Sequence, residues 1–224
     1  MDITNEFSVM VNAGPQTDLF FALQARQMFI VIGEHADAIN ASTFQPVFAT
    51  LQAYASDSFV LAVNRLLERE KTYPLQSIHG VLSFLRAHSS ELPIREPAFL
   101  EQALTRLGYR AGAFGGGSEQ TAAVAEALLE RLPQASENVA LDALKTLRDK
   151  RIAHPERVKA EFLPTTTWES AGTLLKIPTE ALAVCGAYLS IAFVDSDGHS
   201  FAESDARVAA FSTHRLLRQS GIVT

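Results

Sequence analysis

Cysteine is nearly absent from this sequence of 224 residues, which contains only Cys185. One cysteine excludes an intramolecular disulfide framework and fits a reducing compartment. Long hydrophobic runs are also missing, because the apolar uncharged stretch from Ala181 to Val194 is shorter than the roughly 20 residues that span a bilayer. Residues 1–15 lack the basic start of a secretory signal. We therefore expect a soluble, cytoplasmic protein with no membrane partner.

Positive charge is scarce overall, since the chain has a net charge of −6. This balance excludes a protein that binds nucleic acid through its overall charge. The exception is residues 145–159, which carry +4 and leave −10 for the rest of the chain. Any binding of RNA must therefore depend on this local patch.

Several motifs of familiar chemistry are missing as well. The chain has no Gly-x-Ser-x-Gly elbow, and its histidines and cysteine lack the His-Glu-x-x-His and Cys-x-x-Cys spacings of zinc sites. The glycine cluster 112–117 lacks the Gly-Lys-Ser/Thr ending of a phosphate-binding loop. Residues 195–199 resemble a calcium loop only briefly, because the glycine falls two places too early, and a helix-ending turn is expected there. We predict no metal, no cofactor and no covalent nucleophile.

What the sequence does contain is apolar spacing typical of helices in every long segment, within a composition that is 47% hydrophobic. No segment alternates with period two for long enough to predict a strand. We expect one all-α domain over residues 1–224, a bundle of long antiparallel helices with additional short ones, and a flexible glycine-rich loop at about 109–118. The predicted helices cover about 17–40, 42–69, 72–88, 98–107, 119–132, 136–154, 181–194 and 204–219, with 155–167 as a connecting loop.

Chemistry concentrates at the end of the helix predicted over 136–154. Three apolar residues at helical spacing place one face of this helix on the core, namely Leu141, Leu144 and Leu147. Pro155 disfavours helical geometry at the residue before it, so the helix should end near His154. This histidine then lies among cations at a helix C-terminus. One reading is that these groups simply complement the helix dipole, at under roughly 1 kcal/mol for each charge; the residues alone leave a functional reading equally open.

A resemblance favours the functional reading. Arg148-Asp149 followed by His154 resembles the Arg-x(4 to 6)-His motif of HEPN domains, in which a polar residue commonly follows the arginine. Residues 57–70, 72–77 and 147–154 together resemble the AbiU-type abortive-infection branch of that superfamily, over roughly residues 17–200. The resemblance implies an all-helical and usually dimeric fold. In active members it implies metal-independent cleavage of RNA.

The side chains of the motif suit that chemistry. RNA can be cut without metal if a base removes the proton of the ribose 2′-hydroxyl, an acid protonates the leaving oxygen and a cation stabilises the charge developing on the phosphorus. His154 can act as base or acid, and Arg148 can bind phosphate oxygens through its planar fork. Asp149 can orient one of them. The flanking RNA backbone is expected to be held by Lys150, Arg151 and Arg157.

Geometry raises an objection to a site built from one chain. Six residues along an ideal helix place Arg148 and His154 about 120° apart, so they do not easily reach the same phosphate. Either Pro155 draws His154 off the helical path, or a two-fold axis brings together groups from two subunits.

Three hypotheses follow. The first is a HEPN-type ribonuclease in phage defence or acting as a toxin, with RNA as substrate, a homodimer as the active form and an antitoxin as a possible partner. The second is a non-catalytic helical module that binds nucleotide, RNA or protein, and the third is an unrelated enzyme.

Overall fold

The computed structural model describes residues 2–69, 75–134, 136–153, 166–195 and 197–223. Within these ranges the chain is all-α, as predicted, and the only β-type pairing is an isolated antiparallel bridge between Val194 and Ser200. The helices are α1 (Ile3–Val11), α2 (Thr17–Glu34), α3 (Ala36–Asn40), α4 (Gln45–Leu66), α5 (Ile78–Ala87), α6 (Pro97–Arg106), α7 (Gly117–Arg131), α8 (Val139–Leu147), α9 (Trp168–Thr173), α10 (Lys176–Leu189) and α11 (Phe201–Gln219), with π-helical turns η1 (Asn12–Gln16) and η2 (Arg148–Ala153).

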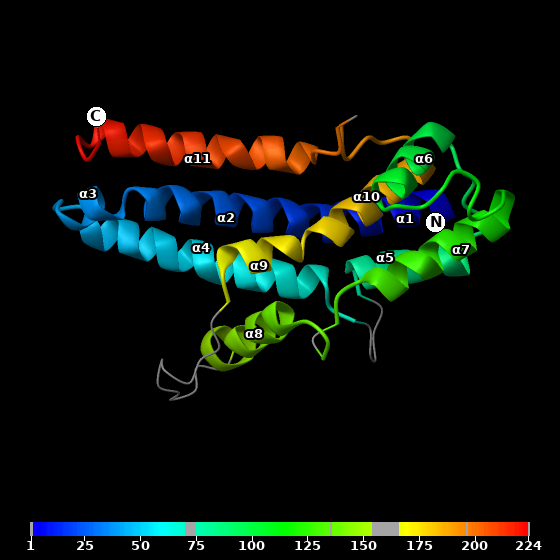
Figure 1. Cartoon of the computed structure of the whole chain (residues 1–224), viewed down its shortest axis with the longest axis horizontal. Coiled ribbons are helices and arrows are strands. Elements are labelled where there is room, and N and C mark those ends of the chain that lie inside the picture. The colour runs from blue at the N-terminus through cyan, green and yellow to red at the C-terminus, as the bar shows by residue number, and fades with distance from the viewer. Residues whose placement is uncertain (1, 70–74, 135, 154–165, 196, 224) are drawn as a thin grey trace.

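The molecule is elongated, with the longest helices side by side along its length (Figure 1). Helix α4 packs antiparallel to α2, and α11 packs against α2 from the other side. The antiparallel arrangement expected for the long helices does not extend to the third predicted helix, 72–88. Helix α5 instead lies beyond the end of α4, where it packs against α1 and α7.

The first predicted helix begins too late and its N-terminal extension was missed. Helix α1 runs through η1 into α2 without leaving helical geometry, although Gly14 and Pro15 lie in η1. A π-turn is wider than an α-turn, so it accommodates an imino acid that supplies no N–H. At the other end the segment breaks at His35, which separates α2 from α3.

Gly14 is required because the chain after α4 crosses it closely. A β-carbon at this position would collide with the backbone carbonyl oxygen of Gln76, which cannot move as a side-chain tip can. We expect Gly14→Ala to lower the free energy of unfolding by about 1–3 kcal/mol, as overpacked sites do. The matched control is Gly33→Ala in α2, where the nearest atom lies 3.9 Å away. That variant should gain about 0.5–1 kcal/mol from helix propensity, and urea denaturation measures both. Equal stabilities of the two variants would contradict the packing argument.

Several predicted helix boundaries are wrong. The predicted start of the third helix, Thr72, lies outside the described residues, and α5 begins only after Ser77, whose hydroxyl accepts a hydrogen bond from the amide of Gly80 at 3.2 Å. Helix α10 runs from Lys176 to Leu189 instead of 181–194, because Pro178 is accommodated in its first turn and Ser190 ends it in the left-handed conformation.

The glycine-rich segment is a loop between α6 and α7, as predicted, although α7 already begins at Gly117. A contact within the loop was not foreseen: Tyr109 and Phe114 pack edge to face with centroids 4.8 Å apart. The guanidinium of Arg131 lies over the Tyr109 ring at 5.3 Å. The loop therefore has an aromatic anchor at its start.

A further short helix, α9, follows the predicted connecting loop, whose residues 155–165 lie outside the described ranges. The Thr167 hydroxyl caps α9 by accepting from the amide of Ser170 at 3.0 Å. Trp168 then packs on Phe29 of α2 and Phe59 of α4, with ring centroids 4.1 and 4.9 Å away. This aromatic cluster fixes α9 on α2 and α4, and α8 packs against α4 and α9. Among the described helices, none combines the length and apolar character that crossing a membrane requires.

Candidate functional site

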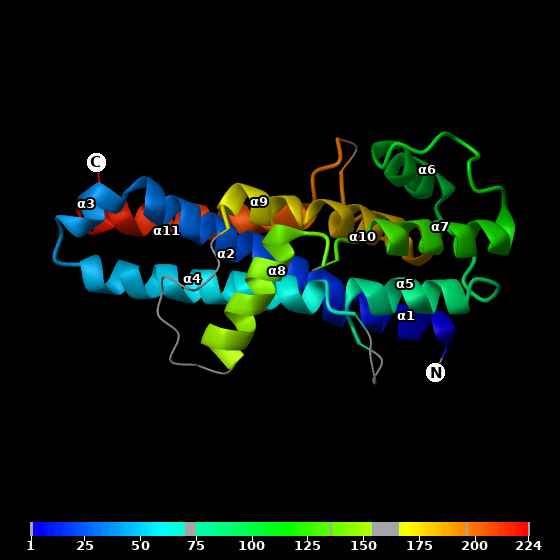
Figure 2. The ribbon, with the colours of Figure 1, turned by 60° about the horizontal axis from the view of Figure 1, so that its bottom comes forward.

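The candidate site lies on α8 and η2, which cross the C-terminal half of α4 on one side of the molecule (Figure 2). Helix α8 is capped by Asn138, whose side-chain oxygen accepts from the amide of Leu141 at 3.1 Å, and not by Ser136 as predicted. Leu141 and Leu144 are buried and Leu147 packs on the core, as their spacing predicted. These contacts fix the helix that carries the cations.

Asn64 of α4 joins the two helices. Its buried amide nitrogen donates to the carbonyl oxygen of Val60 in its own helix at 2.8 Å and to that of Leu144 in α8 at 3.1 Å. A buried amide that donates twice sets the distance between α4 and α8, because leaving either donor unpaired would cost about 1–3 kcal/mol.

The α-helix changes to a π-helix at Arg148, the first residue of the motif. The Nε and Nη2 atoms of Arg148 both lie 2.7 Å from Oδ1 of Asp149. Its Nη1 lies 3.7 Å from the carboxylate of Glu68, which follows α4. The Arg148 side chain is 23% exposed, so the guanidinium is held by two carboxylates and is still partly accessible.

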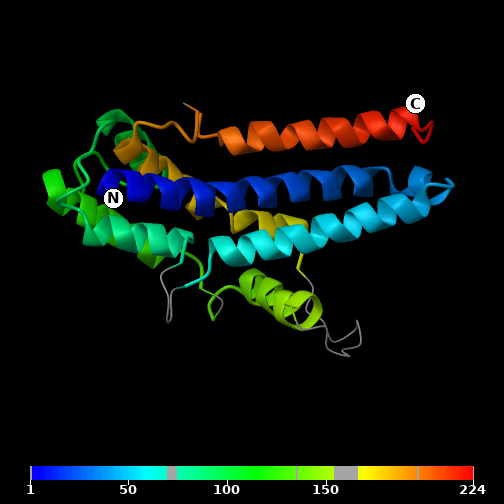
Figure 3. The same cartoon turned by 180° about the vertical axis from the view of Figure 1, so that it is seen from behind.

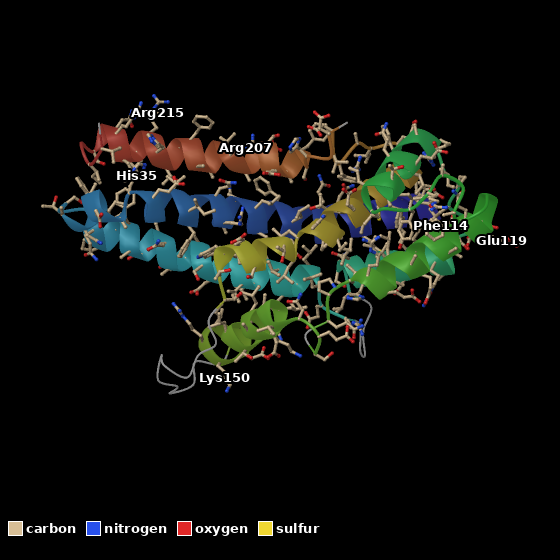
Figure 4. The ribbon with its side chains drawn as sticks, in the orientation of Figure 1. His35, Phe114, Glu119, Lys150, Arg207 and Arg215 are labelled. Atoms are coloured by element: carbon tan, nitrogen blue, oxygen red, sulfur yellow. The ribbon has the colours of Figure 1, made fainter. Side chains whose placement is uncertain are left out.

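The next cations point away from the core. Lys150 and Arg151 are exposed, and Lys150 lies at the outer tip of η2 in Figure 4. Arg151 Nε lies 4.0 Å from Asp57 Oδ1 on α4. An exposed pair at this distance contributes little to stability, so Arg151 can exchange this partner for a phosphate at small cost.

The structure thus brings Arg148, Asp149, Lys150 and Arg151 together on one turn, whereas His154 and Arg157 lie outside the described residues. The helix continues to Ala153, next to the predicted end at His154. The 120° separation was calculated for an α-helix, and the turn that begins at Arg148 is a π-helix, so that angle does not describe this segment.

The carboxylates of α4 were not recognised as partners of the motif. Only the family resemblance linked residues 57–70 to the motif, and the acidic and basic residues near Glu68 otherwise resemble a solvated helix end. The opposite charges of two amphipathic segments could have indicated this pairing. Asp57 and Glu68 lie on one segment, and Arg148 and Arg151 lie on the other.

A pocket of about 270 Å³ lies beside Arg148, between the end of α4, α8 and the segment that precedes α8. Three cations line it, Arg69, Lys145 and Arg148, together with Asn64 and Glu68. The remaining lining residues are Leu67, Pro133, Gln134, Ser136 and Leu141. Sequence analysis did not predict this pocket, because its walls come from three stretches whose contact depends on the fold.

His79 of α5 is buried, and its Nε2 has no hydrogen-bond partner among the described residues. Burial, together with a smaller effect of the nearby charge of Arg69, lowers its pKa from 6.5 to about 4. The described histidines, cysteine and carboxylates form no group of three that could hold a metal ion.

The chain matches a known protein family. Residues 26–210 match the family model HEPN_AbiU2, whose description is AbiU2. The matched range contains α4, α8 and η2, and so both faces of the candidate site. Neither the curated proteins nor the solved structures contain a significant match to the chain.

Proposed function

Because the chain belongs to the AbiU2 abortive-infection branch of the HEPN superfamily, we propose that it is a metal-independent endoribonuclease acting in phage defence or as a toxin. The observation that carries the proposal is the position of Arg148. This guanidinium is fixed by Asp149 and Glu68 at the start of η2, is partly exposed, and faces a pocket with two more cations.

In the proposed reaction His154 removes the proton of a ribose 2′-hydroxyl or donates one to the leaving 5′-oxygen, and solvent water exchanges the other proton. The 2′-oxygen attacks the adjacent phosphorus, and the bond from phosphorus to the 5′-oxygen breaks. Arg148 binds the non-bridging oxygens as negative charge develops on them, while Asp149 orients its guanidinium. Lys150, Arg151 and Arg157 hold the neighbouring phosphates.

The direct test is to incubate the purified protein with total RNA in EDTA. We expect cleavage to continue in the chelator, because every group that the mechanism uses belongs to the chain. The products should end in a 2′,3′-cyclic phosphate and a free 5′-hydroxyl, identified by mass spectrometry of a cleaved oligonucleotide. DNA of the same sequence should stay intact, since it lacks the attacking hydroxyl. Cleavage that appears only with a divalent metal would remove the mechanism.

A specific observation supports a second function, a non-catalytic module that binds nucleotide, RNA or protein. Arg148 already pairs with two carboxylates, and a neutralised guanidinium stabilises less developing charge than a free one. If every RNA stays intact in the test above while RNA binding is retained, this second function is the correct one. A gene for a small nucleotidyltransferase next to this one would favour a toxin with an antitoxin partner.

We also propose a homodimer in which Arg148 and His154 of both copies line one cleft. Helix α11 cannot form such an interface, although it exposes Phe211 by 77%, because it lies on the opposite side of the α2–α4 pair from α8 (Figure 3). The α8 side exposes Val139 by 85%, more than any other large apolar residue described.

Light scattering at micromolar concentration should therefore give about twice the 24.4 kDa of one chain. Val139→Glu should shift the mass toward one chain, because a buried carboxylate without a partner is costly. The matched control Phe211→Glu should leave the dimer unchanged. A wild-type monomer would contradict the shared cleft.

A further inference from the structure

We infer that the pocket beside Arg148 holds one nucleotide of a single-stranded RNA, with the phosphate of that nucleotide bound by Arg69 and Lys145. This inference rests on the proposed function and adds a substrate subsite to it. It assigns roles to two cations that lie outside the Arg148 to His154 motif, and it places one nucleotide at the pocket where the end of α4 meets α8.

Charge is the first argument. Arg148 is paired with Asp149 and Glu68, whereas Arg69 and Lys145 have no ion-pair partner among the described residues, and both are exposed. Two unpaired cations therefore line one pocket of a chain whose net charge is −6, and together they form a site for an anion. A phosphate diester supplies the missing negative charge.

Size and walls are the second argument. The volume of about 270 Å³ is just under the roughly 300–1,000 Å³ of small-molecule sites, so the pocket has room for one nucleotide and not for a duplex. Its walls include the apolar side chains of Leu67, Pro133 and Leu141. A base inserted from a flexible single strand would bury against them, whereas a base inside an RNA helix could not leave the stack without cost.

Asn64 is the third argument. Both hydrogens of its amide are used by the carbonyls of Val60 and Leu144, so the group it has left for a ligand is its carbonyl oxygen. Asn64 is one of the residues that line the pocket, and an amide oxygen suits an amino or imino N–H of a base. The pocket therefore offers cations to the phosphate and an acceptor to the base.

The test measures binding and not cleavage, so it can fail separately from the proposed nuclease. A fluorescent 2′-O-methyl oligonucleotide, which lacks the attacking hydroxyl, is titrated with wild-type protein at several salt concentrations. For the double variant R69A/K145A we expect on the order of tenfold weaker binding at low salt. The slope of log K against log salt should fall by about 0.7, because the two cations together neutralise one phosphate of a single strand.

Two further variants separate the pocket from general electrostatics. The matched control R207A/R215A removes the same charge from α11, far from Lys150 in Figure 4, and should leave the slope unchanged. Ser136→Trp fills the pocket without removing a cation, and should weaken binding while keeping the wild-type slope. Thermal melting checks that each variant is folded.

The outcomes are distinct. Unchanged binding in R69A/K145A, or equal losses in R69A/K145A and R207A/R215A, would overturn the subsite. Adenosine monophosphate that binds at micromolar concentration and is not displaced by the oligonucleotide would also overturn it, in favour of a free-nucleotide site. Loss of binding in R69A/K145A together with an inactive wild type would support the subsite and reject the nuclease.

Discussion

Replacing His154 with alanine should reduce RNA cleavage by about a hundred- to ten-thousand-fold, which is the usual contribution of a general acid or base. The reduction should appear in kcat, because proton transfer occurs only in the transition state. A matched control is His199→Ala, since His199 is 61% exposed and lies in the turn before α11. That variant should cleave RNA at the wild-type rate.

Arg148→Ala should give a loss of similar size for a different reason, because it removes the cation that stabilises the charge on the phosphate oxygens. Arg148→Lys separates charge from geometry. Lysine keeps the charge but has no planar fork, so it should restore only part of the activity. Stability should change little, because Asp149 is left half-exposed and water can solvate its carboxylate.

Two results would contradict these roles. Cleavage that persists in His154→Ala at the wild-type rate would exclude His154 as acid or base. Mixing His154→Ala with Arg148→Ala chains also tests the shared cleft: if each active centre uses one residue from each copy, the mixed dimers should recover part of the activity that both variants lack.

The all-α class was predictable because apolar spacing is a local property, and α4 and α11 pack against α2 from its two sides. The missed features depend on contacts between distant segments. Gly14 and Pro15 resemble a helix stop in the sequence. The helix runs through them because a π-turn forms there, and Gln76 crosses at the glycine. Helix α9 was missed because its short pattern depends on Trp168 packing against α2 and α4.

The candidate site also has one part that could be predicted from the sequence and another that could not. The motif that carries Arg148, Asp149, Lys150 and Arg151 was read from consecutive residues, and the structure places these four on one helical turn. The carboxylate of Glu68 and the pocket with Arg69 come from α4 and the residues after it, about 80 positions earlier in the chain. No rule based on sequence spacing relates residues that lie so far apart in the chain. Their proximity is therefore visible only where α8 crosses α4 in the structure.

The second large effect concerns acid stability. Burial lowers the pKa of His79 from 6.5 to about 4, with a smaller contribution from Arg69. Below pH 6.5 the unfolded chain binds a proton that the folded chain cannot, so stability is lost as the pH falls from 6.5 toward 4 and is fully present above 6.5. The loss for this one group should be on the order of 3 kcal/mol by pH 4.

The measurement is urea denaturation of the wild type and His79→Leu at pH 7, 5.5 and 4. The wild type should lose more stability than the variant across this range, because leucine binds no proton. The measured quantity is the difference in the free energy of unfolding between the two proteins. This difference is needed because buried Asp18 has the opposite effect on the pH dependence of stability. Its pKa is raised by burial, against the lowering effect of its ion pair with Arg65, so its folded state gains protons earlier as the pH falls.

At pH 7 the variant tests a second property of the same side chain. His79 Nε2 is buried without a partner, so leucine removes an unpaired polar atom while keeping most of the side-chain volume. His79→Leu should therefore be at least as stable as the wild type at pH 7, and clearly more stable at pH 4. An exposed-site control, His199→Leu, should follow the pH dependence of the wild type. If His79→Leu and the wild type lose stability in parallel, His79 takes up its proton in the folded state and is not held neutral by burial.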